Sequence, residues 1–336
     1  MPGYHGPMPS NTAPSVSVAL CTHNGERFVG RQVESILAQR PPITELVVSD
    51  DASSDRTVEL VEEVVRRSGQ DVRLRILRNE TPLGVVANFE QALSACTERY
   101  IALSDQDDIW HPERLARILA LFEADERVML VHTDARLIDA NAAPLGATLF
   151  DALEISPQTI AVENEGDALG LLLRRNLVTG ATAVLTKDLV EAARPFPPEW
   201  VHDEWLAVCA ATTRSLRCLP SVSIDYRQHG GNQIGVARPT LGYKLRRMLE
   251  PGRQRQQRLA AQFARLAERS GDISGLGAED RKRIAAKARF EETRAGFPRR
   301  RLKRIVPVLR LAATGGYSRF ASQGRRDVAR DLLRAD

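Results

Sequence analysis

The sequence lacks features that accompany membrane-spanning, disulfide-bonded and base-stacking proteins. No run in its 336 residues approaches the roughly 18 consecutive apolar residues that a membrane-spanning helix needs. Its four cysteines lie far apart and form no C-x-x-C pair, which favours reduced thiols over a disulfide framework or a zinc site. Aromatic residues make up only 5% of the chain and do not alternate with its arginine clusters, which argues against base stacking on nucleic acid.

Two motifs of common nucleotide-binding proteins are also missing. The first predicted strand is followed by Thr22-His23-Asn24-Gly25-Glu26, which has one glycine where a dinucleotide-binding fold has G-x-G-x-x-G. The phosphate-binding pattern G-x-x-x-x-G-K-[ST] does not occur either. The sequence therefore argues against a simple dinucleotide-dependent oxidoreductase and against a P-loop kinase.

The two ends of the chain differ in composition from its middle. Residues 1–15 hold four prolines and two glycines without the basic-then-apolar order of a secretion signal, so we expect a flexible leader and a cytoplasmic protein. Residues 240–336 carry 25 of the 47 Lys and Arg residues but only 10 of the 43 Asp and Glu residues. A basic tail on an acidic body indicates an anionic neighbour, either nucleic acid or a membrane surface. Solvated helices that only brace the domain are the alternative.

Residues 16–131 alternate short β-branched runs with longer amphipathic stretches, which predicts an α/β fold with a doubly wound, mostly parallel sheet. We predict strands at Val16–Cys21, Glu45–Ser49, Val72–Leu77, Tyr100–Leu103 and Val128–His132. We predict helices at Glu26–Ala38, Thr57–Arg67, Val85–Ala95 and Glu113–Phe122. Further along, we expect a helix from His202 and a final strand at Ser223–Tyr226. From Leu241 onward the chain is Arg-rich and helix-compatible, with breaks near residues 271–277, 296–298 and 315–316.

Three of the predicted strands end in polar residues. Thr22 to Asn24 follow the first strand, Asp50 and Asp51 the second, and Asp105-Gln106-Asp107-Asp108 the fourth. Ligands of parallel sheets bind beyond the carboxyl ends of the strands, so these residues predict one site with three contributors. Carboxylates so concentrated repel one another unless a cation lies among them, and a divalent metal holding a diphosphate would supply it. A solvated acidic turn is the plain alternative.

With these motifs in this order, the chain resembles the family 2 glycosyltransferases, inverting enzymes of the GT-A fold that use nucleotide-diphospho-sugars. The resemblance rests on residues 17–25, 45–57 and 103–108. Residues 104–110, 176–180, 202–203 and 226–230 resemble the bacterial rhamnosyltransferase-type branch that builds cell-surface polysaccharides. We therefore expect a catalytic domain at 16–239 and a helical, Arg-rich region at 240–336. The catalytic domain would hold the nucleotide-sugar half at about 16–135 and the acceptor half at about 136–239.

The resemblance implies separate roles for the aspartates. Asp107 would bind Mg²⁺ or Mn²⁺, because in the family the second Asp of the D-x-D motif meets the metal. Asp105 would bond the ribose or orient the ion, and Asp51 would accept a hydrogen bond from a uracil or thymine ring. Asp50 would bond the following turn, since adjacent residues of an extended segment point in opposite directions. Asp108 could instead cap the helix that Pro112 opens, and Asp55 could cap the predicted helix that begins at Thr57.

Several further residues are candidates for holding the nucleotide sugar. Thr22, Asn24 and Glu26 follow the first strand and could contact the nucleotide, or they could begin an N-capped helix. Gly25 would then adopt a positive φ. The remaining candidates are Asn88, which faces the same crevice in the family; Arg227, which could bridge phosphate oxygens; and His229, which could complete the metal's coordination. His23 stands where many relatives have Tyr, and its imidazole could stack on a base.

An inverting transfer needs a base that takes the proton of the attacking hydroxyl. The resemblance assigns this role to Asp203, and a place at a helix start would favour its ionised form. Glu204 takes the role if the register is shifted by one, and an ordinary capped helix is the alternative without a base.

Together these residues predict a metal-dependent inverting glycosyltransferase of cell-envelope polysaccharide synthesis. The expected donor is dTDP-rhamnose or a UDP-hexose, and the acceptor a hydroxyl of a glycan or lipid-linked glycan. The basic tail could contact the anionic inner face of the plasma membrane, because its arginines are mixed with apolar residues. Two alternatives are a basic-tailed nucleic-acid-binding protein and a non-catalytic GT-A interaction scaffold. The low aromatic content argues against the first, and the presence of Asp51, Asp105, Asp107 and Asp203 against the second.

Overall fold

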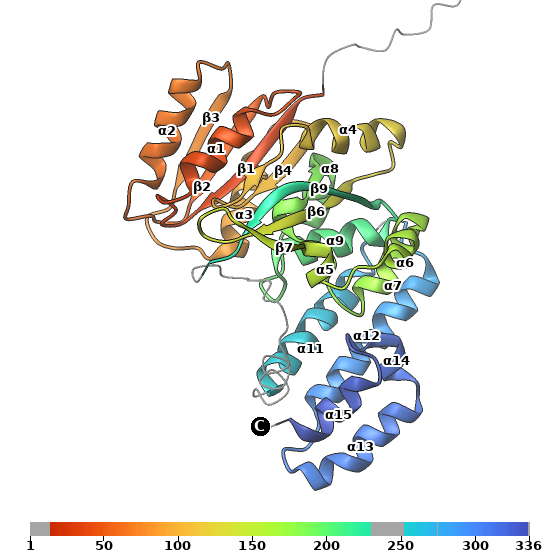
Figure 1. Cartoon of the computed structure of the whole chain (residues 1–336). Coiled ribbons are helices and arrows are strands. Elements are labelled where there is room, and N and C mark those ends of the chain that lie inside the picture. The colour runs from red at the N-terminus through yellow and green to blue at the C-terminus, as the bar shows by residue number, and fades with distance from the viewer. Residues whose placement is uncertain (1–13, 230–251, 274, 335–336) are drawn as a thin grey trace, which may run out of the picture.

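The computed structural model describes residues 14–229, 252–273 and 275–334 (Figure 1). Most of the predicted leader, the glycines after His229 and the predicted boundary near residue 239 lie outside these residues. Within the described parts, a mixed sheet is flanked by helices on both faces, and further helices follow it in the chain. This confirms the predicted α/β class, and the division into domains stays a prediction.

The first half of the sheet is parallel, as the alternating pattern predicts. Its strands lie in the order β3-β2-β1-β4. The bounds are β1 Val16–Thr22, β2 Glu45–Asp50, β3 Arg73–Arg78 and β4 Tyr100–Ser104. The connecting helices are α1 Val29–Leu37, α2 Thr57–Ser68 and α3 Val85–Ala95. Each element lies within three residues of its prediction at both ends.

The second half of the sheet is mixed, with the order β4-β8-β6-β9-β5 and β7 paired to β6. β8 is antiparallel to both of its neighbours, while β6 and β9 are parallel. The bounds are β5 Ile109–Trp110, β6 Leu130–Ile138, β7 Pro144–Thr148, β8 Val184–Thr186 and β9 Leu216–Arg227. The prediction found only the end of β9. Pro220 interrupts its apolar pattern at a point where the register against β6 shifts, which is a place where strands tolerate proline.

Two hydrophobic cores lie on the two faces of the sheet. On β1, Val18 and Leu20 share one core with Val33 of α1, whereas Ala19 shares the other with Phe89 of α3. This is the alternation that a strand covered on both faces requires. The first core also includes α4 Arg114–Ala124. The second also includes α7 Ala168–Leu172, α8 Lys187–Ala193 and α9 His202–Thr212.

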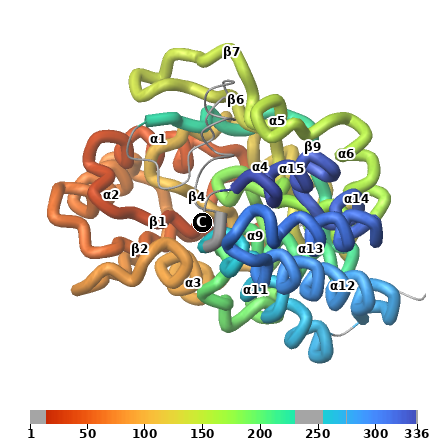
Figure 2. The backbone as a smooth tube through the Cα atoms, turned by 90° about the horizontal axis from the view of Figure 1, so that it is seen from below, coloured from red at the N-terminus to blue at the C-terminus, as the bar shows by residue number. Residues whose placement is uncertain are grey.

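Five helices follow the sheet in the described C-terminal part of the chain, and the predicted breaks between them are confirmed. Their bounds are α11 Gly252–Arg269, α12 Ala278–Ala295, α13 Arg301–Ala313, α14 Gly316–Phe320 and α15 Arg326–Leu333. Phe263 and Leu266 of α11 are buried in the core of the sheet domain. A third core lies among α12, α13 and α14 and includes Phe290, Val308 and Tyr317. Figure 2 shows these helices to one side of β1, β2 and α2.

The helices in the described parts of the chain include none that is both long enough and apolar enough to cross a membrane.

Candidate active site

The ends of β1, β2 and β4 bring the predicted site residues to one edge of the sheet. β1 lies between β2 and β4 and is parallel to both, so the three carboxyl ends meet. Thr22 is the last residue of β1, and its Oγ1 donates to Asp50 Oδ2 over 2.7 Å. Asp50 also accepts from the backbone N and the Oγ of Ser53, at 2.9 and 2.6 Å. Asp50 therefore holds the turn after β2, as predicted.

The loops after β1 and β2 are bonded to each other. Asn24 Oδ1 accepts from the backbone N of Ser54 over 2.9 Å, and Glu26 Oε2 accepts from that of Arg56 over 3.3 Å. Asp55 Oδ1 accepts from the N of Thr57 over 3.0 Å, although the residue in the N-cap position of α2 is Arg56. The side chains of Asn24 and Glu26 are exposed, and both are bonded to the neighbouring loop. Their contact with a nucleotide, like that of Thr22, stays a prediction.

Gly25 does not have the positive φ that we expected. The residue with a positive φ is Asn24, at 47°, and Asn is among the residues that tolerate this region. Gly25 leaves space for the Gln106 amide, because a Cβ there would collide with that side chain and displace it. The Gln106 amide brackets the backbone of His23: its Oε1 accepts from His23 N over 2.8 Å, and its Nε2 donates to His23 O over 3.0 Å. The middle residue of the D-x-D motif therefore fixes the loop after β1.

Asp51 is nearly buried and is bound by the loop before α3. Its carboxylate accepts from Asn79 Nδ2, Leu83 N and Gly84 N at 3.1, 2.7 and 2.9 Å. A carboxylate can accept about four hydrogen bonds, so its capacity is nearly used. Asn88 is buried beneath this loop, where it accepts from Ser49 Oγ over 2.6 Å and donates to Ser49 O over 2.9 Å. Base recognition by Asp51 and nucleotide contact by Asn88 stay predictions.

Asp105, Asp107 and Asp203 come close enough together for their charges to interact. Burial, followed by the negative charges of Asp107 and Asp203, raises the pKa of Asp105 to about 7. Among the described residues, none of the three carboxylates forms an ion pair with Lys or Arg. The predicted meeting of the D-x-D motif with the late aspartate is therefore present in the fold.

His229 completes this cluster from the other side of the sheet. Its Nε2 lies 2.7 Å from Asp107 Oδ2, and its ring stacks on Phe28 with a centroid distance of 4.9 Å. The two residues are 122 positions apart in the chain. They meet because β5, which begins directly after Asp108, pairs with β9, and β9 ends two residues before His229. Carboxylate oxygen and imidazole nitrogen are donors that bind divalent cations such as Mn²⁺. This donor set, with the carboxylates of Asp105 and Asp203 close by, fits the predicted metal.

Asp108 does not cap a helix, contrary to our expectation. β5 intervenes before α4, whose N-cap residue is Glu113. Asp108 is instead fully buried, and its Oδ1 accepts from the backbone N of Arg227 over 3.0 Å. Its Oδ2 has no hydrogen-bond donor among the described residues. Burial raises the pKa of Asp108 well above its ordinary range, and the charges of Asp107 and Asp105 act in the same direction. Asp108 thus joins the D-x-D segment to the end of β9.

Arg227 serves the same junction with its side chain. Its Nε donates to Asp107 O over 2.7 Å, and its Nη1 donates to the carbonyls of Asp139 and Ala140 at 3.1 and 3.2 Å. Its guanidinium carbon also lies 4.8 Å from the ring centre of Phe28. These contacts hold the backbone of the D-x-D segment, so diphosphate binding by Arg227 stays a prediction.

Asp203 lies in the first turn of α9, where the helix dipole favours a negative charge. Its Oδ2 accepts from the backbone N of Gly180 over 2.9 Å, and its Oδ1 from that of Glu204 over 2.7 Å. His202 is buried beneath it and stacks on Phe89 at 3.8 Å. Burial raises the pKa of Glu204 to about 7, with a further contribution from Asp203. A carboxyl group with a pKa near the working pH is suited to general base catalysis, so Glu204 stays an alternative to Asp203.

Sequence reasoning missed residues that position the site. Gln106 was passed over as the variable residue of the D-x-D motif, although a Gln between two acids is itself a possible signal. Asn79 and Gly84 act on Asp51 from a loop without a known pattern. Gly180 lies against His202 and Asp203, and it could have been suspected only as a glycine inside an apolar run.

The family model described as Glycosyl transferase family 2 matches residues 17–153. The putative glycosyltransferase EpsE of Bacillus subtilis (strain 168) is 33% identical over 129 residues, which are 38% of this chain and 46% of the relative. The UDP-Glc:alpha-D-GlcNAc-diphosphoundecaprenol beta-1,3-glucosyltransferase WfgD of Escherichia coli is 27% identical over 197 residues, which are 57% of this chain and 69% of the relative. The chain therefore spans about half of the first relative and about two thirds of the second.

Two solved structures are similar over nearly the whole chain. TarS 1–349 of S. aureus, in complex with UDP-GlcNAc, has a TM-score of 0.59 at 14% identity and covers 95% of this chain and 89% of that one. The mannosyltransferase PcManGT from Pyrobaculum calidifontis, in complex with GDP-Man and Mn²⁺, has a TM-score of 0.55 at 18% identity, with coverages of 97% and 88%. These likenesses confirm the fold class, including the C-terminal helices. The family match and the relatives' names indicate a transferase enzyme.

Proposed function

We propose that this chain, with its family 2 glycosyltransferase domain at residues 17–153, transfers a sugar from a nucleotide-diphospho-sugar to a hydroxyl group with inversion at the anomeric carbon. The observation that carries the proposal is the convergence of Asp105, Asp107, His229 and Asp203 at the carboxyl edge of the sheet. Asp203 comes from a separate segment, and among the described residues no Lys or Arg forms an ion pair with Asp105, Asp107 or Asp203, although the charge of Arg227 acts on Asp107. Such an arrangement supports a site that receives a cation and a charged ligand.

Asp203 is the proposed catalytic base. The acceptor oxygen forms a bond to the anomeric carbon while the bond from that carbon to the phosphate oxygen breaks. The hydroxyl proton moves to a carboxylate oxygen of Asp203, and the nucleoside diphosphate leaves with the bonding electrons. Each oxygen of Asp203 accepts one backbone hydrogen bond, which fixes the carboxylate in place and leaves a lone pair for the proton.

Asp107 and His229 are the proposed ligands of Mg²⁺ or Mn²⁺, with Asp105 beside them. A bound divalent cation would stabilise the charge that develops on the departing diphosphate. The Mn²⁺ in the PcManGT complex supports this proposal by similarity of fold only.

The donor and acceptor are proposed more broadly. dTDP-rhamnose is the first candidate donor, from the resemblance of the motifs, and a UDP-hexose is the second. UDP-GlcNAc in the TarS complex and the UDP-glucose named for WfgD support the second. A lipid-linked glycan of the cell envelope is the proposed acceptor, because the name of WfgD includes a diphosphoundecaprenol acceptor. An acceptor of this kind would lie at a membrane, and the cationic tail is suited to an anionic one.

The test measures nucleoside diphosphate release and sugar transfer with a panel of nucleotide sugars and Mn²⁺. Asp107→Ala should abolish donor hydrolysis and transfer, whereas Asp203→Asn should abolish transfer and leave donor binding intact. Asp188→Asn is the matched control, because Asp188 is an exposed acid in the first turn of α8 and does not act on the pKa of Asp105. Normal turnover by either site variant would contradict the proposal, as would equal losses in the control.

A further inference from the structure

Helix α13 presents large apolar side chains to solvent. The exposed fractions are 83% for Leu302, 41% for Ile305, 55% for Val306 and 53% for Leu309. Four of the eight large apolar residues that are exposed in the described part of the chain lie on this one helix. Figure 1 shows α13 at the outer edge of the C-terminal helices, on the side away from the central sheet.

The exposed residues form one stripe along the helix. Their spacing of i, i+3, i+4 and i+7 places them on a single face. The opposite face is held in the protein by Val308 in the third core and by Arg304, which is fully buried. Arg304 donates to the carbonyls of Pro298 and Asp331 at 2.9 and 3.1 Å. The helix is therefore anchored on one side and apolar on the other, so the exposed stripe is a stable feature of the fold.

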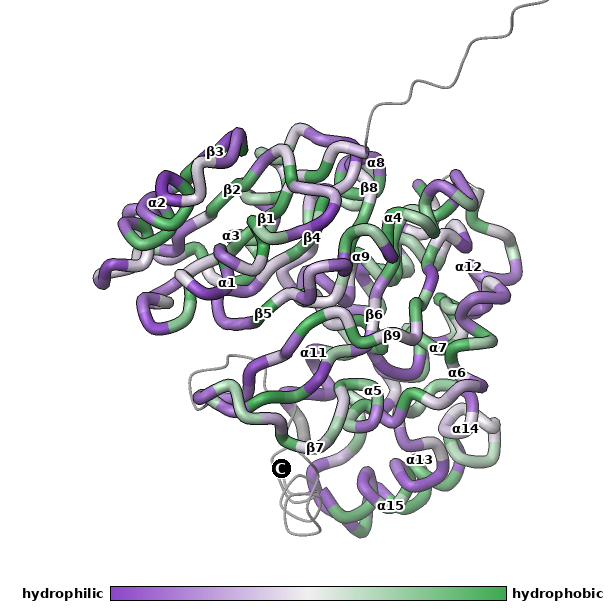
Figure 3. The backbone as a smooth tube through the Cα atoms, turned by 45° about the horizontal axis from the view of Figure 1, so that its top comes forward, coloured by the Kyte–Doolittle hydropathy of each residue, from purple (hydrophilic) through white to green (hydrophobic). Residues whose placement is uncertain are grey.

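Cations border this stripe on both sides. Lys303 and Arg310 lie three residues before and four residues after Val306, which places them together along one border. Arg301 precedes Ile305 by four residues and lies along the other. All three are exposed. The surrounding sequence has no counter-charge, since residues 293–326 contain ten Lys and Arg residues and no Asp or Glu. Figure 3 shows hydrophobic and hydrophilic residues alternating along α13.

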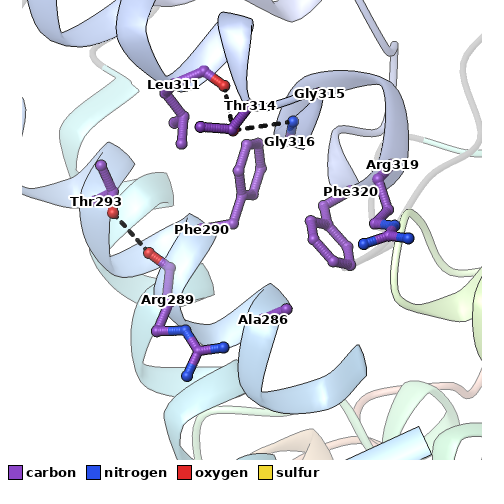
Figure 4. A pocket seen from close by; sticks show the side chains of 10 residues that line it. All are labelled: Ala286, Arg289, Phe290, Thr293, Leu311, Thr314, Gly315, Gly316, Arg319 and Phe320. Carbon is purple, nitrogen blue, oxygen red and sulfur yellow. Dashed lines mark hydrogen bonds between the residues drawn. The ribbon is translucent and has the colours of Figure 1, made fainter. Parts of the chain in front are cut away.

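A groove of about 610 Å³ opens beside the end of α13 (Figure 4). Leu311 of α13 and Thr314, directly after this helix, line the groove, and the rings of Phe290 and Phe320 lie inside it. Arg289 and Arg319 also line it, and none of its lining residues is acidic. The groove thus repeats the composition of the stripe, with apolar surface next to unopposed positive charge.

We propose that α13 docks on an anionic lipid bilayer, with its apolar stripe among the acyl chains and Arg301, Lys303 and Arg310 at the lipid phosphates. Apolar residues flanked by cations along one face are the pattern of helices that lie in a membrane interface. A second copy of the chain suits this surface less well, because a symmetric contact would place cations against cations. This docking assigns to α13 the membrane contact that the proposed function includes, and it does not require that the chain transfers a sugar.

The test is co-sedimentation of the full chain with phosphatidylcholine vesicles that contain either no phosphatidylglycerol or about 30% of it, at about 0.1 M salt. Binding is expected only to the anionic vesicles. Replacing Leu302 and Leu309 together by Ser should lower the partition coefficient at least about tenfold, since each change removes an apolar side chain that the bilayer would bury. Leu145→Ser is the matched control, because Leu145 is 43% exposed on β7 and lies outside the stripe. It should bind like the wild type.

The cations are tested separately. Lys303→Gln with Arg310→Gln should lower the partition coefficient about 25-fold, at about fivefold per charge near an anionic surface. Arg265→Gln with Lys282→Gln removes two exposed cations from α11 and α12 and should change binding less than about threefold. The replaced side chains are all exposed, and circular dichroism checks that the variants fold.

Three results would overturn the proposal: equal binding to neutral vesicles, unchanged binding of the Leu302/Leu309 variant, or a dimer in light scattering that this variant dissociates. The last would assign the stripe to a second copy. Transfer to a soluble acceptor should be unaffected by all these variants, so failure of docking and failure of the transferase assignment are distinguishable.

Discussion

Gly180→Ala tests whether close packing around α9 positions the proposed base. The backbone N of Gly180 donates to Asp203 Oδ2 over 2.9 Å. A Cβ on residue 180 would lie 2.9 Å from His202 Nε2 and 3.4 Å from the Cβ of Asp203. His202 cannot easily move aside, because it is buried and its ring lies flat on Phe89 at 3.8 Å. The new methyl group should therefore displace the start of α9.

The expected magnitudes follow from these contacts. Overpacking of a buried site costs about 1–3 kcal/mol, so the free energy of unfolding should fall by that amount. A shift of about 1 Å in a positioned catalytic group can cost about 100-fold in rate, so kcat/KM for transfer should fall about that far. Donor binding should change little, because Asp105 and Asp107 follow β4 and do not lie on α9 or on the segment that holds Gly180. The measurements are urea unfolding, transfer kinetics and donor affinity.

Two comparisons make this prediction sharper. Gly30→Ala adds a methyl group inside α1 with only Val64 at 3.9 Å, so it should stabilise the protein by about 0.5–1 kcal/mol and leave kcat/KM unchanged. In the double variant Gly180→Ala with His202→Ala, the smaller side chain leaves room for the methyl group. Its loss of stability should therefore be less than the sum of the two single losses. Wild-type kinetics and stability of Gly180→Ala would refute the reasoning.

Three further predictions concern the buried network, the pH dependence and the metal. Asp331→Asn should lower the free energy of unfolding by about 3–5 kcal/mol, because buried Arg294 loses the carboxylate to which it donates two hydrogen bonds, at 2.7 and 3.2 Å. Glu268→Gln removes one partner of an exposed ion pair and should cost less than about 1 kcal/mol in the same urea experiment. Burial raises the pKa of Glu204 to about 7, compared with about 4.3 in the unfolded chain, so ionisation of this group opposes folding increasingly as the pH rises from about 4.3 towards 7. Glu204→Gln should therefore raise Tm more at pH 8 than at pH 5. An equal rise at both pH values would contradict this. Chelation with EDTA should abolish donor turnover, and added Mn²⁺ should restore it. His229→Ala should need a higher Mn²⁺ concentration for the same turnover, because it removes a proposed metal ligand. Turnover that persists in EDTA would exclude a metal requirement.

The parallel half of the sheet could be predicted from sequence because its signals are local. Val16–Thr22 and Tyr100–Ser104 are buried on both faces, and such strands are continuous apolar runs that end at polar residues. The mixed half could not be predicted in the same way. β8 has only three residues, and β9 contains Pro220, so their pairing depends on long-range contacts that no short pattern records.

Aspartates with adjacent positions in the sequence take different parts in the structure. Asp107 and Asp108 are neighbours, yet Asp107 faces His229 whereas Asp108 binds the backbone of Arg227. The expected helix cap at Asp108 was wrong because the next two residues form β5 and pair with β9. The role of each carboxylate is set by an element about 120 residues further along the chain, which a local motif cannot reveal.

The basic tail is structurally part of the candidate active site, although its composition suggested a separate appendage. Trp200, just before α9, donates from Nε1 to Gln262 O of α11 over 3.0 Å. Arg258 and Gln262 of the same helix act on the Glu204 carboxyl group next to Asp203. The helix that carries the proposed base is thus braced by the region that carries α13. If α13 docks on a bilayer, the bilayer also fixes the orientation of α9, and a lipid-linked acceptor would approach Asp203 from a defined side. Transfer to a lipid-linked acceptor in anionic vesicles should then fall when the stripe of α13 is disrupted, while transfer to a soluble acceptor should not.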